Sequence, residues 1–316
     1  MNDRIPPSSI SVSIAAVERD TGLSKDTLRV WERRYGFPMP ERDRFGERAY
    51  PLEQVERLRV IKRLLDGGHR PGRVVPLGME QLLEIGEALP STPQRAPSTQ
   101  TDLNRYLELL QSHDLPAFRR ALAQAQLRMG LSALVIDLIA PLNTLVGDAW
   151  MRGQLAVFEE HVYTECISVL LRSALASVPP IEAQVRPRVL LGTFPQEPHS
   201  LGLLMAQTLL ALEGCDCVSL GPQTPVASIA AGAVAYQADV VALSFTTTLN
   251  ANIVMGGLAE LRAQLGPECE IWVGGQCPII HRKPIEGVIT ISQLQDVAHE
   301  VSRWRDRRQA VQDHGV

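Results

Sequence analysis

The sequence has few aromatic residues and few cysteines, and the number and spacing of the cysteines argue against two kinds of stabilising site. Phe, Trp and Tyr together make up 5% of the 316 residues. The cysteines are odd in number and include no Cys-x-x-Cys pair. Neither a disulfide framework nor a structural zinc site is therefore expected. The five cysteines are Cys166, Cys215, Cys217, Cys269 and Cys277.

Long apolar stretches are also missing. Because no uncharged apolar run reaches about 18 residues, no membrane-spanning helix is expected. The N-terminal segment MNDRIPPSSISVS lacks the apolar core of a secretory signal, which predicts a cytoplasmic protein. With 45% hydrophobic and 21% charged residues, the composition is that of a folded chain, and the length predicts two or three domains.

Charge is distributed unevenly along the chain. The net charge is −4, but residues 1–75 hold 15 Lys and Arg against 11 Asp and Glu, a balance of +4. The remaining residues hold 16 against 24, a balance of −8. A basic segment joined to an acidic one favours a nucleic-acid-binding module at the N-terminus.

Helical and strand patterns divide the chain into domains. Residues 10–82 read as short helices with breaks, and residues 83–102 as a linker rich in Pro and Thr. Residues 103–180 keep helical periodicity through four segments, which predicts an antiparallel four-helix bundle. A second linker spans 178–187, and the last domain covers 186–316.

The last domain alternates short branched apolar runs with helical segments. This alternation predicts a doubly wound parallel sheet of about five strands, that is, a Rossmann-like α/β domain. Ligands of such sheets bind beyond the carboxyl ends of the strands. The expected strands are 189–194, 217–221, 240–245, 271–275 and 287–292, and the expected helices are 200–214, 225–237, 250–265 and 293–307.

The segment 13–36 has the pattern of a helix-turn-helix. A short helix ends at Gly22, and Ser24 is placed to cap a second helix with an apolar face of Leu28, Trp31 and Tyr35. Arginines around Gly46 fit a hairpin wing, and a further helix follows from 52 to 65. The predicted DNA contacts are Ser24, Lys25, Thr27, Arg29, Arg33, Arg34, Tyr35, Arg42, Arg44 and Arg48.

A charge run alone would be read as a solvated surface, but here helix-turn-helix spacing and wing occur together. Residues 11–80, with WERRYG and the later Arg-x-Tyr, resemble the winged-helix domain of MerR-family transcriptional regulators, in particular the subgroup with a C-terminal cobalamin-binding module. The resemblance implies dimeric binding to a promoter repeat, with the second helix in the major groove. The segment after Gly72 is shorter than the coiled-coil helix through which the family dimerises.

Several features point to a cofactor site at the sheet edge. The first strand is followed by Glu197-x-His199-x-x-Gly202, where a carboxylate can orient an imidazole that binds a metal. Ser244 and Thr246 end the third strand, and Gly274 and Gly275 end the fourth, which leaves room for a flat ligand tail. Each piece alone is as easily a polar loop or a strand-ending turn; together they favour a site.

The bundle adds the spacing Trp-x9-Glu-His, with Trp150 at the end of one helix and Glu160 and His161 at the start of the next. With the sheet-edge motif, residues 103–316 resemble the cobalamin-binding module of the CarH/LitR-type light-responsive regulators. That resemblance implies His199 as lower cobalt ligand backed by Glu197. It also implies that the nucleotide tail of the cofactor lies along Ser244, Thr246, Gly274 and Gly275, and that Gly202 allows close approach of the backbone. The adenosyl pocket would be formed by Trp150, Val157, Glu160 and His161.

The resemblance further implies a mechanism. Adenosylcobalamin would hold a dimer or tetramer on double-stranded promoter DNA and repress it in the dark, and light would cleave the cobalt–carbon bond and disperse the oligomer. Met151 is a departure, because family members that capture the light state place a second histidine there.

Three functions from different classes follow from these observations. The favoured one is a cobalamin-dependent repressor, photoresponsive by resemblance. The alternative is a MerR-type regulator whose C-terminal domain answers to another ligand or to a protein partner. A cobalamin-carrying enzyme subunit is disfavoured, because 316 residues leave no room for a catalytic barrel and the DNA-binding segment would have no role. We therefore expect no enzyme.

Overall fold

The computed structural model shows two compact units, formed by residues 1–92 with 151–154 and by residues 93–150 with 155–316. Residues 88–96 and 180–185, which fall in the two predicted linkers, lie outside the described residues. The structure describes residues 11–43, 46–66, 69–87, 97–179, 186–247, 249–282 and 284–313.

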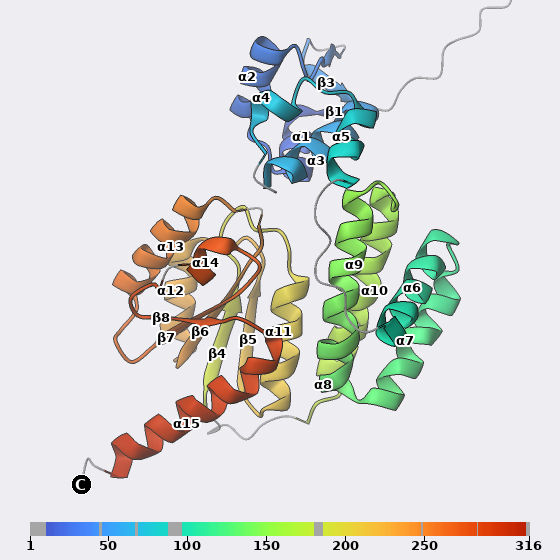
Figure 1. Ribbon diagram of the computed structural model, residues 1–316. Helices are drawn as coiled ribbons and strands as arrows, with labels where there is room; N and C mark the ends of the chain where they lie inside the picture. Colours follow the sequence, from blue (N-terminus) through green and yellow to red (C-terminus); the bar gives the residue numbers. More distant parts are fainter. Residues whose placement is uncertain are drawn as a thin grey trace, which may run out of the picture. The chain divides into compact units, whose positions relative to one another are not determined.

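The N-terminal unit contains the predicted helix-turn-helix and wing hairpin, and strand β1, which was not expected, extends the wing to a small antiparallel sheet of order β1-β3-β2 (Figure 1). Ser24 caps the second helix by accepting a hydrogen bond from the Thr27 N–H, and Leu28 and Trp31 bury its inner face. The elements are β1 (Ser11–Ser13), α1 (Ile14–Thr21), α2 (Lys25–Tyr35), β2 (Glu41–Arg42), β3 (Arg48–Pro51), α3 (Leu52–Asp66), α4 (Pro71–Val74) and α5 (Met79–Glu87).

The C-terminal unit begins with the predicted bundle of four long helices (Figure 1). The first of them starts at Pro97, inside the segment expected to be a linker, and the third contains a π-helical stretch. Tyr106, Phe118 and Tyr163 pack edge to face at the centre of the bundle. The helices are α6 (Pro97–Gln111), α7 (Leu115–Met129), α8 (Leu131–Ala133) continuing through Leu134–Ile139 into α9 (Ala140–Met151), and α10 (Val157–Ala176).

The rest of this unit is the predicted doubly wound domain, with five parallel strands in the order β5-β4-β6-β7-β8. All five expected strands are present, and the short helix α14 was not expected. The elements are β4 (Arg188–Gly192), α11 (Leu201–Leu212), β5 (Asp216–Gly221), α12 (Val226–Ala235), β6 (Val240–Phe245), α13 (Ala251–Gln264), β7 (Glu270–Gly275), α14 (Pro278–Arg282), β8 (Val288–Ile291) and α15 (Val297–Asp313), the last preceded by a 3-10 turn at Leu294–Asp296.

The two faces of the sheet carry separate cores. Val189 and Leu191 of β4 belong to a core that continues through α11 into the bundle, whereas Leu190 between them belongs to the core under α12 and α13. This alternation is what a strand buried on both faces produces. The bundle and the sheet are therefore joined by one continuous apolar core, and α10 packs on α11.

The strand order positions the candidate site. β4 pairs with β5 on one side and with β6 on the other, so the connections after β4 and β5 leave in opposite directions. In parallel sheets the carboxyl ends of strands at such a switch point form a crevice that binds ligands. The loop after β4 and the end of β6, which hold the predicted site residues, lie at this point.

One helical segment of the described chain, Leu131–Trp150, is long and apolar enough to cross a membrane by length and composition. It is the third helix of the bundle. Leu134, Val135 and Leu138 on it are buried in the bundle core.

The end of β7 sets a strict backbone requirement, which gives a stability prediction. Gly275 has φ +106°, and a Cβ added there would lie 2.2 Å from the Phe245 carbonyl oxygen. We expect Gly275→Ala to lower the free energy of unfolding by about 3 kcal/mol in urea titrations. Gly256→Ala, at an open position of α13 with nothing near, should instead raise it by about 0.5–1 kcal/mol. Equal values for the two variants would contradict the prediction.

Candidate cofactor site and nucleic-acid interface

The loop after β4 holds a carboxylate–imidazole pair. The Nδ1–H of His199 donates to Glu197 Oε1 over 2.7 Å, and the His199 backbone N–H donates to the same oxygen over 3.2 Å. Glu197 is fully buried, whereas 54% of the His199 side chain is exposed. Because Nδ1 is held by the carboxylate, Nε2 carries the lone pair and is the ring nitrogen left for a ligand.

The other oxygen of Glu197 is bound from the neighbouring strand. Glu197 Oε2 accepts the backbone N–H of Thr246 at 2.8 Å and its hydroxyl at 2.7 Å. Burial raises the pKa of the Glu197 carboxyl, but the hydrogen bonds from His199 and Thr246 outweigh it and leave that pKa below its ordinary value. Thr246 was expected beside a nucleotide tail; its hydroxyl is instead directed to the carboxylate.

Small residues keep the backbone close around this pair. A Cβ on Gly202 would meet the Ser244 hydroxyl oxygen at 3.0 Å, so the start of α11 packs against the end of β6 without a side chain between them. At the end of β7, the imidazole of His281 lies 2.7 Å from the Gly275 carbonyl oxygen, which holds the glycine-rich turn from the outside. Gly274 pairs with Ser244 in the sheet register and Gly275 follows it, so these three predicted residues lie together at the carboxyl ends of β6 and β7.

The bundle residues of the predicted site lie at one helix end and the next helix start. Trp150 is half-buried against the bundle core near the end of α9. On the first turns of α10, Val157 is half-buried, and Glu160 accepts the Thr164 hydroxyl at 2.8 Å and the His161 Nδ1–H at 2.7 Å. These positions are those expected from the sequence, and Glu160 and His161 form a second carboxylate–imidazole pair.

The donor set suits a metal that arrives within a cofactor. Within the described residues there is no group of three or more His, Cys, Asp or Glu side chains that could hold a bare metal ion. His199 therefore offers one oriented ring nitrogen at the end of a sheet lined by glycine and hydroxyl residues. A single protein ligand is sufficient where the cofactor itself fills the other positions around the metal, as an equatorial macrocycle does.

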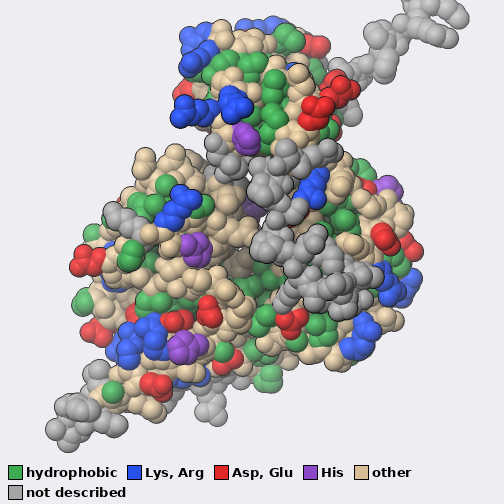
Figure 2. Space-filling model, viewed as in Figure 1, with side chains coloured by type: hydrophobic (Ala, Val, Ile, Leu, Met, Phe, Trp, Pro, Cys, Tyr) green, Lys and Arg blue, Asp and Glu red, His purple; other side chains and the backbone are tan. Residues whose placement is uncertain are grey.

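The predicted recognition helix α2 carries basic side chains at its exposed positions. Lys25 is tied to α1 by a 3.4 Å ion pair with Glu18, and Arg29 lies half-exposed beside Asp26 at 3.4 Å. Arg33 and Arg34 are exposed at the other end of the helix, next to the half-buried Tyr35. Figure 2 shows Lys and Arg side chains gathered on the side of this unit where α2 lies.

The wing differs from the expectation at one arginine. Arg48 at the start of β3 donates to Glu32 of α2 over 2.9 Å, so it connects the wing to the recognition helix and is less available to a phosphate. Arg42 donates to the Gly46 carbonyl oxygen over 2.8 Å across the wing turn. Arg44 lies outside the described residues.

Sequence patterns did not reveal the partners that organise these sites. Glu32 was not singled out, and neither was the pairing of Thr246 with Glu197 over 49 positions. The contact between His113 and Glu159, 2.9 Å long and 46 positions apart, was also missed. A Glu at the third position of a helix is a known capping signal, and Glu159 holds that position in α10, so this signal was present.

Comparison with known families and structures agrees with this architecture. The model of the MerR HTH family regulatory protein matches residues 12–75, and models of the B12 binding domain match residues 102–173 and 187–288. The monomethylamine corrinoid protein of Methanosarcina barkeri superposes with a TM-score of 0.51, covering 64% of this chain and 97% of that one. At 12% identity this likeness shows the fold: helical bundle followed by parallel sheet.

The Glu197 hydrogen bonds give a prediction that needs no ligand. Thr246→Val removes the hydroxyl donor but keeps the backbone N–H, so the buried carboxylate loses one of its partners. We expect the free energy of unfolding in urea to fall by about 1–3 kcal/mol. Thr246→Ser keeps the hydroxyl and is the matched control, with a loss well under 1 kcal/mol expected. If Val and Ser lower stability equally, the hydroxyl does not support Glu197.

Two curated relatives extend over most of the chain. The HTH-type transcriptional repressor CarH of Myxococcus xanthus is 30% identical over 268 residues, which cover 84% of this chain and 89% of that protein. The repressor CarA of the same organism is 31% identical over 241 residues, covering 75% and 77%. The chain is therefore a member of the family of MerR-type transcriptional regulators with a C-terminal B12-binding module, to which CarH and CarA belong.

Proposed function

We propose that this protein is a transcriptional repressor that binds promoter DNA through α2 and the wing and senses adenosylcobalamin through its C-terminal unit. The observation that carries the proposal is the Glu197–His199 pair, which presents one oriented ring nitrogen at the switch point of the sheet. It is supported by the B12-binding matches on both halves of the same unit. By this proposal the protein works in the cytoplasm, because its partner is promoter DNA.

Each predicted site residue has a defined task in this proposal. Bound adenosylcobalamin supplies a light-sensitive cobalt–carbon bond. Glu197 holds the imidazole of His199 in the tautomer that leaves Nε2 to the cobalt, and Thr246 holds Glu197. The nucleotide tail would lie along Ser244, Thr246, Gly274 and Gly275, and Gly202 allows the close approach of the backbone at the start of α11. Trp150, Val157, Glu160 and His161 enclose the upper side and exclude water.

Repression in this proposal follows from a shift of the protein between association states. A ligand bound by one assembly state and not by another stabilises that state in proportion to its differential affinity. We propose that the adenosyl form favours a dimer or tetramer, which brings several α2 helices onto one promoter, and that light reverses this. The sequence has Met151 at the position where family members that capture cobalt after illumination have a second histidine, so this chain is expected to keep no bis-imidazole light state.

The cofactor assignment is tested by the absorption spectrum of the full chain. After gel filtration in the dark with adenosylcobalamin, we expect about one corrinoid per chain and a spectrum of imidazole-ligated cobalt. His199→Ala should weaken binding at least about tenfold and lose that spectrum. His299→Ala, an exposed histidine on α15, is the matched control and should bind as the wild type does. Sedimentation before and after green light then measures the oligomer.

Two results would count against the proposal. Equal corrinoid uptake by the wild type and His199→Ala would remove His199 from the site. No uptake by the wild type would favour a MerR-type regulator that responds to another ligand or to a protein partner. An unchanged sedimentation coefficient with and without the corrinoid would remove the link to assembly.

The DNA-binding half makes a prediction about specificity. Arg29 lies on the first half of α2, where side chains reach base edges, while Arg33 lies nearer its end, where phosphates are contacted. With a site selected from random DNA by the full chain, Arg29→Ala should lower discrimination against unselected DNA by about 1–3 kcal/mol. Arg33→Ala should weaken both complexes alike and reduce the salt slope by about 1. Fluorescence anisotropy at several salt concentrations measures both; identical behaviour of the two variants would contradict this division.

A further inference from the structure

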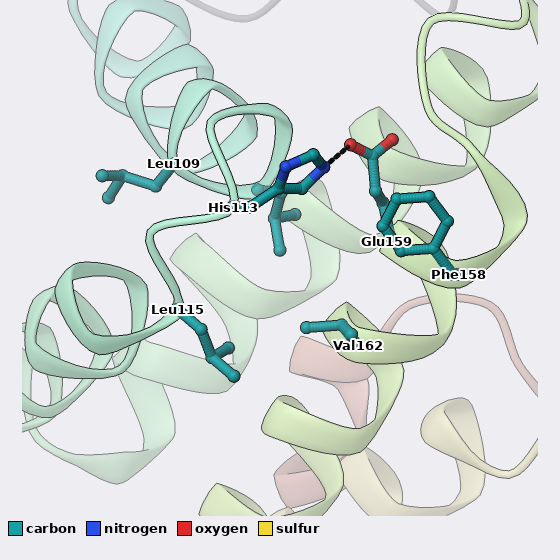
Figure 3. A pocket seen from close by; sticks show the side chains of 7 residues that line it. Leu109, His113, Leu115, Phe158, Glu159 and Val162 are labelled. Atoms are coloured by element: carbon teal, nitrogen blue, oxygen red, sulfur yellow. Dashed lines mark hydrogen bonds and ion pairs between the residues drawn. The ribbon is translucent and has the colours of Figure 1, made fainter.

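A cavity of about 190 Å³ lies between the corner joining α6 to α7 and the beginning of α10 (Figure 3). Its walls are mostly aliphatic, from Leu109 and Leu115 on one side and Val162 on the other. Two polar groups interrupt this apolar lining, the imidazole of His113 and the carboxyl group of Glu159. They are hydrogen bonded to each other, His113 from the corner between α6 and α7 and Glu159 from the first turn of α10.

These two groups form a chain of hydrogen bonds to the start of α10. His113 Nε2 lies 2.9 Å from Glu159 Oε1, and Glu159 Oε2 accepts the backbone N–H of Ala156 at 2.6 Å. Only 10% of the Glu159 side chain is exposed. Ala156 is the N-cap of α10 and has no side chain able to accept a hydrogen bond, so only the reciprocal half of a capping box is present, in which Glu159 accepts the N–H of the N-cap residue.

The corner supplies its imidazole in a demanding backbone conformation. His113 has φ +58°, in the left-handed region that few residues other than Gly, Asn, Asp and His adopt readily. Its ring also contacts the Phe158 ring at 5.5 Å between centroids. The corner thus approaches the first turn of α10 with two side-chain contacts, one to Phe158 and one to Glu159.

The opposite face of the same turn carries the predicted upper pocket. At 100° per residue, Val157, Glu160 and His161 lie on one side of α10, whereas Phe158, Glu159 and Val162 lie on the other. The rest of α10 is held by Tyr163, Ile167 and Leu171, which are buried in the bundle core. The His113 contact therefore acts on the first turn alone.

We propose that His113 is a positioning residue: through Glu159 it fixes the first turn of α10 from behind and so orients Val157, Glu160 and His161 toward the adenosyl side of the cofactor. The orientation of Val157, Glu160 and His161 toward the cofactor rests on the proposed function. The immobilisation of the turn concerns the unliganded protein and is tested without any corrinoid.

Hydrogen exchange of the full chain, read by mass spectrometry, tests whether His113 immobilises the first turn of α10. His113→Asn tolerates the left-handed backbone but lacks the reach of Nε2, so amides in residues 155–162 should exchange about tenfold faster. His113→Gln places an amide N–H where Nε2 lies, and Gln adopts the same left-handed conformation at positions 196, 223 and 237 of this chain, so this variant should exchange as the wild type does. Residues 201–212 of α11 serve as internal reference, and His299→Asn on α15 is the matched surface control.

The orientation of the upper-pocket residues toward the cofactor is tested by the ratio of the affinities for adenosylcobalamin and hydroxocobalamin. His113→Asn should lower this ratio about tenfold, because only the adenosyl form uses the upper pocket, and His113→Gln should restore it. Unchanged exchange at 155–162, or equal acceleration at 201–212, overturns the positioning role. Faster exchange with an unchanged ratio overturns the coupling to the cofactor. If the wild type binds neither corrinoid, the proposed function fails, while the exchange data still decide the role of His113.

Discussion

The C-terminal unit depends on one buried carboxylate, that of Glu197. A fully buried carboxylate is costly unless hydrogen bonds replace its lost water. Here four donors do so: the ring and backbone N–H of His199 and the backbone N–H and hydroxyl of Thr246. These donors come from the loop after β4 and from the residue that follows β6, two strands that are neighbours in the sheet, and they are 47 positions apart in the chain. The β4–β6 pairing is therefore what gives the imidazole of His199 a defined orientation.

The N-terminal unit uses charge in a related way. Two of its basic side chains are engaged in internal contacts, Lys25 with Glu18 and Arg48 with Glu32. Each contact joins two elements of the motif, α1 to α2 and the wing to α2. Exposed ion pairs contribute little to stability, but here they fix the recognition helix relative to its neighbours. Two basic side chains of this segment thus hold α2 to its neighbours, while Arg29 and Arg33 are the ones proposed to contact DNA.

The regular elements were predictable because their signals are local. The strands β4 to β8 appear as branched apolar runs, and β6 has the predicted bounds, since a strand buried on both faces needs such a run. The start of α6 at Pro97 was missed, because Pro and Thr content indicates a linker and a first-turn proline is compatible with either. The five-residue helix α14 is too short to show periodicity.

The site was predictable in part for the same reason. Glu197 and His199 are two positions apart, so their pairing is visible in the sequence, whereas the bond between Glu197 and Thr246 requires the strand order. The pairing of Arg48 with Glu32 requires the position of the wing beside α2. Contacts of this kind depend on tertiary neighbours that no short window of sequence contains.

The two helix starts that matter for function are built on opposite principles. α2 begins with Ser24, whose hydroxyl caps the helix from within its own segment, so the recognition helix has a locally encoded start. α10 begins with Ala156, which cannot cap, and its start relies on Glu159 and on His113 from the distant α6–α7 corner. A locally capped helix keeps its shape when its surroundings change, while one held by a distant residue responds to them. The first suits a fixed DNA reader, and in the proposed function the second keeps the upper-pocket residues oriented for as long as the α6–α7 corner holds the turn.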